Sequence, residues 1–369
     1  MQQVLSSSAA NPLGGARPDE LLPATRRAGR WFERAWARVL FSALGLGFVA
    51  WLLSRVDLLL VWGELSQLLP FVPVMILLEA GRIAGEYFST RQLSGASAKE
   101  LPRRTMLQAH LMSYALSIGL PIGRLFAEGA KATLLARHIG GPRAAAVATS
   151  SHVLCLVSDA TFLVTLSGLV WFLSGHSMLT YAVFTQAALS CLLAAALWVL
   201  RRAAWPAKAL RRLPKAAAWA TQMRRAQLPL GRQVGRAMAG LLFGRTCQVA
   251  IFLVAFAVTR TPGNSLASLV SASAGAQALN QLAGAVGDLM PAQLGVTDAL
   301  FKGSAPLLGV SVETALAIAV AFHLVQLFWI TVGLASPHWF GRAASASELA
   351  ADLPVQVITS GRRSRERVG

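Results

Sequence analysis

The chain has 369 residues, of which 55% are hydrophobic and only 14% are charged, and its formal net charge is +18. A mean hydropathy of +0.54 excludes an ordinary soluble domain and predicts an all-α, polytopic membrane protein. The basic residues cluster between apolar runs, where the membrane surface explains them better than nucleic acid does. The three cysteines lie within apolar runs and form no CxxC pair, so we expect no disulfide, metal site or cofactor.

The N-terminal residues 1–35 are rich in Ser, Ala, Pro and Gly and lack the apolar segment of a signal peptide, so we predict a disordered cytoplasmic tail. A cluster of arginines then precedes the first apolar run, 39–56, and places its start in the cytoplasm. An outer loop with Asp57 and Glu64 but no basic residue is expected next. The second run, 69–90, returns to the cytoplasm.

A broken apolar stretch follows, between two basic flanks. Because both flanks are expected in the cytoplasm, residues 105–140 are predicted to form a re-entrant helical hairpin that enters the membrane from that side. Its helices should be interrupted near Gly119, Pro121 and Gly123, which disfavour a continuous helix. The run 145–173 then crosses to the outside.

The run 178–200 brings the chain back to residues 201–236, which hold ten Lys and Arg and no acidic residue. This is the strongest orientation signal in the chain. It predicts a cytoplasmic loop that lies on the anionic inner leaflet. The run 237–259 is then expected to cross outward.

A second broken stretch, with Pro291 and Gly295, lies within residues 264–308. Both ends of this stretch are expected outside, so it is predicted to form a second re-entrant hairpin that enters from the outer face. The last run, 311–335, crosses back to the basic tail, 338–369, which should also be cytoplasmic.

Two membrane halves, 36–174 and 178–337, therefore share one order of elements: crossing, crossing, hairpin, crossing. In each half an acidic residue follows the proline of the break by seven positions, Glu128 in the first and Asp298 in the second. Since the halves run in opposite senses, the predicted fold has about six full transmembrane helices plus two re-entrant hairpins in an inverted-topology repeat. Paired broken segments of this kind indicate a substrate site.

At these breaks the chain resembles the transmembrane region of the lysylphosphatidylglycerol synthase family, flippase-like membrane proteins of bacteria and archaea. The segment from Gly123 to Glu128 is similar to the family signature Pro-Gly-Arg-x-Gly-Glu, with a longer spacing and without its second glycine. The segment from Pro291 to Asp298 is similar to Pro-Gly-Gly-x-Gly-x-x-Glu, with Ala and Gln in place of two glycines and Asp in place of Glu. Asp159 resembles an acidic position that follows the first signature.

The resemblance implies transport. Full-length synthases of the family also carry a soluble aminoacyl-transferase domain after the membrane part, whereas this chain stops about 30 residues after its last predicted crossing. We therefore expect a non-enzymatic, flippase-like transporter of an anionic lipid or lipid-linked headgroup that works by alternating access. The expected location is the bacterial inner membrane, with both termini in the cytoplasm.

Charged side chains inside the predicted helices are the candidate substrate contacts, because each costs about 2.5–3.5 kcal/mol at the centre of a span. Arg124, at the start of a half-helix, is expected to bind a headgroup phosphate. Arg82 and Arg245 would line the path as a pseudo-symmetric pair, although Arg82 could instead pair with Glu79 and lock the bundle. The predicted set is Arg82, Arg124, Glu128, Lys131, Asp159, Arg245 and Asp298, with hairpin breaks at Gly119, Pro121, Gly123, Pro291 and Gly295.

Other interpretations are open at this point. Arg124, Glu128 and Lys131 share a helix face and could form only a salt-bridge ladder at the cytoplasmic surface. His152 and His323 are expected to be hydrogen-bonded core residues and not proton carriers. The functional alternatives are a lipid-modifying transferase, although we find no acidic pair in the loops, and a non-transporting subunit that recruits a partner through the basic loop.

Overall fold

The computed structural model describes residues 57–120, 123–202, 231–259, 265–286, 293 and 295–340. All regular structure in this part of the chain is helical. Five of the helical segments described are long and apolar enough to cross a membrane: Leu58–Leu93, Gly141–Ser174, Met178–Ala196, Arg232–Val258 and Val312–Phe340. The prediction of an all-α membrane protein is confirmed. The first apolar run, both tails and most of the basic loop lie outside the described residues.

The first half begins with a helix where the sequence predicted an outer loop. Asp57 is the N-cap of α3 (Leu58–Leu68), and its Oδ1 accepts from the backbone N–H of Leu59 at 2.9 Å. A 3-10 turn, Leu69–Phe71, joins α3 directly to α4 (Val72–Leu93), so the loop prediction is wrong. The reason is that the apolar face of α3 packs against α14, and this packing stabilises the helix.

The first break joins two short helices, as predicted. α5 (Arg103–Gly119) and α6 (Gly123–Ile139) pack on each other, and Leu120 between them is extended. Only glycine fits at Gly123, because a Cβ there would lie 2.3 Å from the carbonyl oxygen of Leu116. The predicted break at Pro121 lies outside the described residues.

Two long helices follow, α7 (Gly141–Ser174) and α8 (Met178–Arg202). The connections before and after α7 carry Gly140 at φ +80° and Gly175 at φ +60°, backbone conformations that favour glycine. The turn between α7 and α8 matches the short loop that the sequence predicts there.

The second half repeats this order. α11 (Arg232–Val258) leads to α12 (Leu266–Val286) and α13 (Val296–Leu308), and α14 (Val312–Phe340) completes the described part of the chain. Gly295, at φ +82°, precedes α13 as its N-cap. The second predicted break is therefore present as two helices, while Pro291 itself lies outside the described residues.

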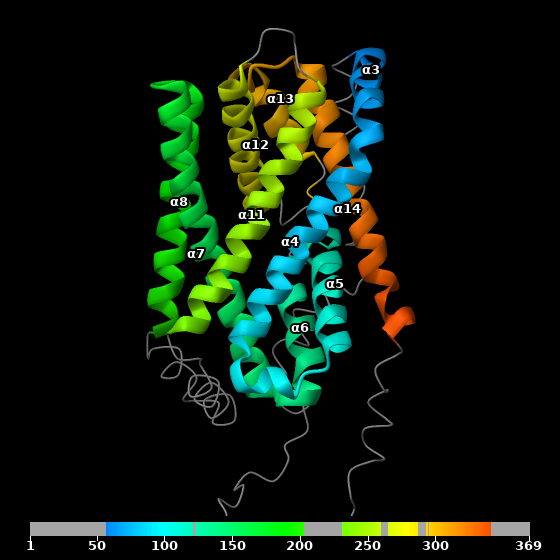
Figure 1. Cartoon of the computed structure of the whole chain (residues 1–369), viewed down its shortest axis with the longest axis vertical. Coiled ribbons are helices and arrows are strands. Elements are labelled where there is room, and N and C mark those ends of the chain that lie inside the picture. Colours follow the sequence, from blue (N-terminus) through cyan, green and yellow to red (C-terminus); the bar gives the residue numbers. More distant parts are fainter. Residues whose placement is uncertain are drawn as a thin grey trace, which may run out of the picture.

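The packing of the two halves corresponds element by element. α4 lies along α11; α5 packs on α6 and α14, and likewise α12 packs on α13 and α7. Figure 1 shows the α5–α6 pair in the lower part of the molecule and α12–α13 in the upper part. This exchange of ends supports the inverted repeat. That each pair enters the membrane without crossing it stays a prediction.

Glycines allow α4 and α11 to approach closely along their shared line. Gly81 and Gly85 on α4, and Gly240 and Gly244 on α11, each follow the GxxxG spacing typical of close helix contacts in membranes. A Cβ on Gly85 would lie 2.3 Å from the carbonyl oxygen of Gly240. Backbone contact between α4 and α11 therefore links the two halves near the centre of the molecule.

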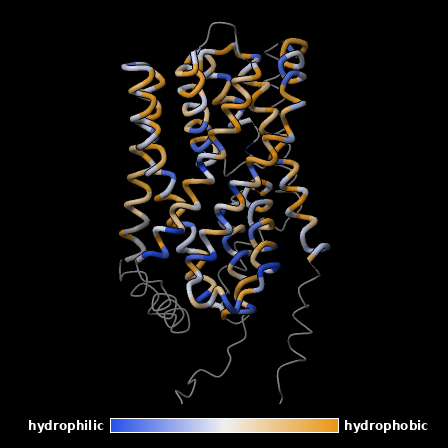
Figure 2. The backbone as a smooth tube through the Cα atoms, viewed as in Figure 1, coloured by the Kyte–Doolittle hydropathy of each residue, from blue (hydrophilic) through white to orange (hydrophobic). Residues whose placement is uncertain are grey.

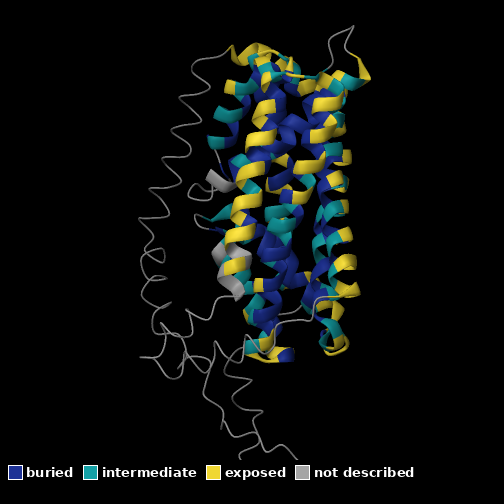
Figure 3. Cartoon of the chain, turned by 90° about the vertical axis from the view of Figure 1, so that its left-hand side faces the viewer, coloured by how far each residue is buried: buried dark blue, intermediate teal, exposed yellow. Residues whose placement is uncertain are grey.

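The outer faces of the long helices are apolar, and polar residues concentrate inside. Figure 2 shows hydrophobic colouring along most of the helical shafts, and Figure 3 shows buried residues forming the interior of the bundle. Large apolar side chains are left exposed, such as Leu59 at 81% and Phe172 at 87%. An apolar surface of this extent is typical of contact with lipid.

Candidate functional site

A cavity of about 200 Å³ lies between the two halves. Its lining side chains come from α4 to α8, from α11, α12 and α14, and from Gln293 at the second break. Six of the seven predicted substrate-binding residues line it: Arg82, Arg124, Glu128, Lys131, Asp159 and Arg245. The structure therefore brings together residues that are up to 163 positions apart in the sequence.

Arg82 is held by carboxylates on its own helix. Its Nε donates to Oε1 of Glu79 at 2.7 Å, and its Nη1 donates to Oε1 of Glu86 at 2.5 Å. The guanidinium also lies 4.8 Å from the ring centroid of Tyr114, whose hydroxyl donates to Glu79 at 3.0 Å. The pairing with Glu79 that the sequence allowed does form, and it forms in the wall of the cavity.

Arg245 is held by residues of α7 and by Gln248 on its own helix. It donates to Asp159 on α7 and, through Nη2, to Sγ of Cys155 at 3.2 Å. Its Nη1 donates to Oε1 of Gln248 at 2.7 Å, and the same oxygen accepts from Nε2 of Gln277 on α12 at 3.1 Å. Arg245 thus connects α11 in the second half with α7 in the first.

The two arginines have corresponding positions in the repeat. Arg82 follows Gly81 and Arg245 follows Gly244, at the line where α4 and α11 meet. Both are almost buried, with side-chain exposures of 11%. Burying a guanidinium is costly unless its donors are satisfied, which explains why each has several acceptors around it.

The first hairpin supplies a second group of charges. Nζ of Lys131 donates to Oε1 of Glu128 at 3.0 Å, and Lys131 is only 5% exposed. The ladder that the sequence suggested is therefore partly formed, but these two residues line the cavity and do not form a purely surface pair. Oε2 of Glu128 is buried and has no hydrogen-bond partner among the described residues.

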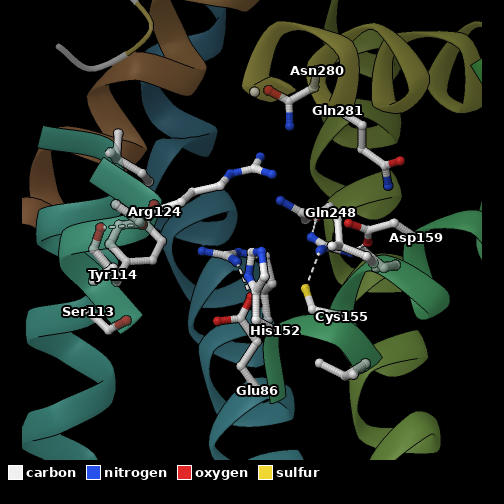
Figure 4. A pocket seen from close by; sticks show the side chains of 18 of the residues that line it. Glu86, Ser113, Tyr114, Arg124, His152, Cys155, Asp159, Gln248, Asn280 and Gln281 are labelled. Atoms are coloured by element: carbon white, nitrogen blue, oxygen red, sulfur yellow. Dashed lines mark hydrogen bonds and ion pairs between the residues drawn. The ribbon is translucent and has the colours of Figure 1, made fainter. Parts of the chain in front are cut away.

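Arg124, just after the first break, reaches α12 of the second hairpin. Its side chain extends into the cavity between Asn280 and Gln248 (Figure 4). A Cβ on Gly284, in α12, would lie only 2.8 Å from Nη2 of Arg124 and 3.5 Å from Nε2 of Gln293. The break of the first hairpin and the break of the second thus meet at the cavity, which neither half could form alone.

Asp298 is the one residue of the seven predicted substrate contacts that does not line the cavity. It is 4% exposed, its Oδ2 accepts from the backbone N–H of Gly295 at 2.9 Å, and its Oδ1 lies 3.4 Å from Nε2 of His323. Nδ1 of His323 is in turn 3.0 Å from Oε1 of Gln326. Asp298 therefore holds the start of α13 against α14. The matched spacing of Glu128 and Asp298 does not translate into matched environments.

His152 lines the cavity from α7, whereas His323 lies behind it in the Asp298 contact. Sequence reasoning missed the amide side chains of the lining as site residues. It assigned none of them to the site. Their signal was a set of amides within apolar runs. The six are Gln186, Gln248, Asn280, Gln281, Gln293 and Gln326.

No set of three or more His, Cys, Asp and Glu side chains with metal-ligand geometry occurs within the described ranges. Comparison with curated proteins and with solved structures gave no match. The family model for the lysylphosphatidylglycerol synthase transmembrane region, in contrast, matches residues 35–334. That match covers both halves and every cavity residue. With five apolar helices in its described part that are long enough to span a bilayer, this multi-pass membrane protein belongs to the lysylphosphatidylglycerol synthase transmembrane-region family.

Proposed function

We propose that the protein is a flippase-like transporter that moves an anionic lipid or lipid-linked headgroup between the two leaflets by alternating access. The observation that carries this proposal is the charged cavity where the breaks of the two hairpins meet. Four basic side chains line it, namely Arg82, Arg124, Lys131 and Arg245. Guanidinium groups suit phosphate oxygens because they donate two parallel hydrogen bonds.

Such a cavity would lower the energetic cost of moving a charged headgroup across the membrane. A charged headgroup must pass a hydrocarbon layer of about 30 Å, and unpaired charge is strongly disfavoured there. The cavity provides ion pairs and hydrogen-bonding groups inside the helical bundle. The acyl chains can stay in the bilayer, against the apolar outer faces of the helices. A headgroup could therefore exchange its hydration for protein contacts.

The repeat suggests how the cavity changes its access. In alternating access, one half moves against the other around a central site. Among the contacts that cross between the halves, two lie at the cavity: the ion pair of Arg245 with Asp159 and the approach of Arg124 to Gly284. We infer that these contacts break and re-form as the halves move, because both join elements of opposite halves beside the substrate.

The same proposal includes the location in the bacterial inner membrane, with cytoplasmic termini and the basic loop 201–236 on the anionic leaflet. Charge balance supports this orientation, since that loop contains ten basic residues and no acidic one. A lipid-modifying transferase and a partner-recruiting subunit are the alternatives that the following experiment must separate from transport.

The test is a lipid-translocation assay with the purified full chain in vesicles that contain lipids with a fluorescent label on an acyl chain. A membrane-impermeant quencher reports how fast labelled lipid reaches the outer leaflet. We expect Arg124→Ala to slow translocation at least about tenfold, because hydrogen bonds to charged groups contribute about 1.5–3 kcal/mol. Arg137→Ala is the matched control, since Arg137 is an exposed residue near the end of the same helix.

Two outcomes would overturn the proposal. In the first, vesicles with wild-type protein translocate no labelled lipid faster than protein-free vesicles do. Chemical change of the lipid in the same vesicles would then favour the transferase. Alternatively, Arg124→Ala and Arg137→Ala could translocate lipid equally well, which would remove Arg124 from the substrate path.

A further inference from the structure

A buried aspartate and a histidine lie behind the cavity, between α13 and α14. Asp298 is 4% exposed, and its Oδ1 lies 3.4 Å from Nε2 of His323, whose side chain is 14% exposed. Nδ1 of the same imidazole lies 3.0 Å from Oε1 of Gln326. We call Asp298 and His323 the acid–histidine pair. The pair does not line the cavity, but Gln326 does, so the imidazole lies directly behind the cavity wall.

The imidazole lies between two hydrogen-bond acceptors. An ionised carboxylate only accepts, and so does the amide oxygen of Gln326. A neutral imidazole has one N–H, so it can donate to one of these groups and must present a lone pair to the other. Nε2 of His323 is shielded from solvent and makes no hydrogen bond among the described residues. One additional proton, held between His323 and Asp298, satisfies both contacts.

The electrostatic surroundings of the pair are simple. Within the described ranges, Asp298 is the charged group that acts on His323, and His323 is the charged group that acts on Asp298. The neighbouring helices α4, α5 and α11 direct their charged and titratable groups into the cavity, where these interact with one another or with Asp159: Glu79, Arg82, Glu86, Tyr114 and Arg245. The other titratable groups on elements packed against α13 and α14 are Glu64 on α3 and His110 on α5. The state of the pair therefore depends mainly on its own proton.

The pair is connected to the second break as well as to the cavity wall. Oδ2 of Asp298 accepts from the backbone N–H of Gly295 at 2.9 Å, at the start of α13. With the extra proton, an imidazolium faces the carboxylate and attracts it. Without that proton, the lone pair of Nε2 faces a negative charge and the attraction is lost. Proton occupancy therefore changes how strongly the second hairpin is held against α14.

The first half contains the corresponding residues. Glu128 and Asp298 each follow the proline of their break by seven positions, and His152 and His323 follow it by 31 and 32. Glu128 and His152 both line the cavity, and the charge of Glu128 acts on His152. One copy of the pair is thus open to the cavity, and the other is closed behind it. Movement of one half against the other is the way in which such a repeat opens its closed side.

We propose that the acid–histidine pair is a proton-binding site, and that its proton is the co-ion of transport, the ion that moves together with the lipid. The proton is held on Nε2 of His323 against Asp298 and is released when the second hairpin moves away from α14. The co-ion role rests on the transport function proposed above. The proton site itself rests only on the geometry of the pair, and it replaces the expectation that His323 is not a proton carrier.

The first experiment detects the proton without any transport. The full chain, with ¹⁵N-labelled histidine, is purified in detergent, and the ring nitrogens are followed by NMR between about pH 5 and 9, the range around which histidine titrates. We expect one ring, whose signal is absent in His323→Gln, to carry N–H groups on both nitrogens at low pH and to lose one proton as the pH rises. In Asp298→Asn the doubly protonated ring should be less populated at each pH.

The second experiment asks whether this proton is coupled to transport. Vesicles with the full chain and a lipid labelled on an acyl chain are prepared with equal pH on both sides, or with a pH gradient in either direction. A tenfold change in proton concentration shifts a half-occupied site to about nine tenths or one tenth occupancy. We therefore expect the gradient to change the wild-type rate at least about threefold, in opposite senses for its two directions. The rate with His323→Gln should not respond to the gradient.

Asp298→Asn is the second variant if His323→Gln does not fold. An asparagine can still accept from the N–H of Gly295 but carries no charge, so the response to the gradient should be reduced. His110→Gln is the matched control, because His110 is a 3% exposed histidine on α5 that does not line the cavity. It should respond to the gradient as wild type does.

The outcomes separate this inference from the proposed function. A His323 ring that keeps a single N–H over the whole pH range overturns the proton site, whether or not the protein moves lipid. If wild-type protein moves no lipid, the transport function fails and the co-ion role fails with it, while the NMR titration still decides the site. If wild type moves lipid and ignores the gradient, or if folded His323→Gln responds as wild type does, transport stands and the co-ion role is wrong. Loss of the response in His323→Gln, with His110→Gln like wild type, supports it.

Discussion

Gly85 allows α4 to lie against the backbone of α11. A Cβ there would lie 2.3 Å from the carbonyl oxygen of Gly240, so neither helix could keep its position. We expect Gly85→Ala to lower the free energy of unfolding by about 1–3 kcal/mol, measured as a lower melting temperature in detergent. Gly235→Ala on α11 is the control: its Cβ would meet nothing within 4 Å, and alanine should stabilise the helix by about 0.5–1 kcal/mol. Equal melting temperatures for Gly85→Ala and wild type would contradict the close contact.

The ion pair between Arg245 and Asp159 depends on both members. Their side chains are 11% and 17% exposed, so each charge is largely removed from water. Asp159→Asn should destabilise the protein by up to about 3–5 kcal/mol, because it leaves a buried guanidinium without its carboxylate. Adding Arg245→Gln should recover part of that loss. Strictly additive effects in a double-mutant cycle, measured by thermal unfolding, would show that the two residues are not coupled.

α13 is the element in which sequence pattern and structure lead to different expectations. The spacing from Pro291 predicts that loss of Asp298 abolishes transport, whereas the structure uses Asp298 to hold the start of this 13-residue helix. We expect Asp298→Ala to cost about 0.5–2 kcal/mol of stability, as for loss of a helix cap, and to lower the melting temperature. Translocation of labelled lipid in the vesicle assay, with equal pH on both sides, should stay near the wild-type rate. Normal stability with slowed translocation would return Asp298 to the substrate path.

α8 illustrates how a helix can carry site residues on one face only. Along α8, Leu189 and Leu192 are 53% and 69% exposed, while Gln186 is 8% exposed and lines the cavity. The helix therefore presents an apolar face for lipid and two polar residues, Gln186 and Ser190, for the site. Such a pattern is visible in the sequence only as an isolated amide in an apolar run.

The opposed hairpins belong to the molecule as a whole. The connection from α6 to α7 lies in the lower part of Figure 1 and the start of α12 in the upper part. In a protein whose three native cysteines are replaced, we expect Gly141→Cys to react with a membrane-impermeant thiol reagent only from the cytoplasm and Leu266→Cys only from outside. Both positions are exposed, and Gly141 has open space around it, unlike Gly123. Reaction of both cysteines from one side would rule out the inverted repeat.

The sequence by itself determined the class of protein, the extent of the long helices, the two breaks and the family. These depend on local signals: apolar runs of sufficient length, basic flanks, and glycines or prolines where a helix must end. It also identified six cavity residues, because charge inside an apolar run is rare enough to mark a site. The prediction was wrong at α3. The sequence there has acidic but no basic residues and was interpreted as an outer loop, whereas packing against α14 stabilises a helix.

Only the tertiary structure decided which polar residues meet. The amide side chains of the cavity lining come from α8, α11, α12, α14 and the second break, and no spacing within the chain predicts that group. Glu128 and Asp298 have the same distance from their prolines, yet one faces the cavity and the other faces His323. The direction of a side chain depends on the rotation of its helix against its neighbours. That rotation is set by the close packing of glycines and large side chains across both halves.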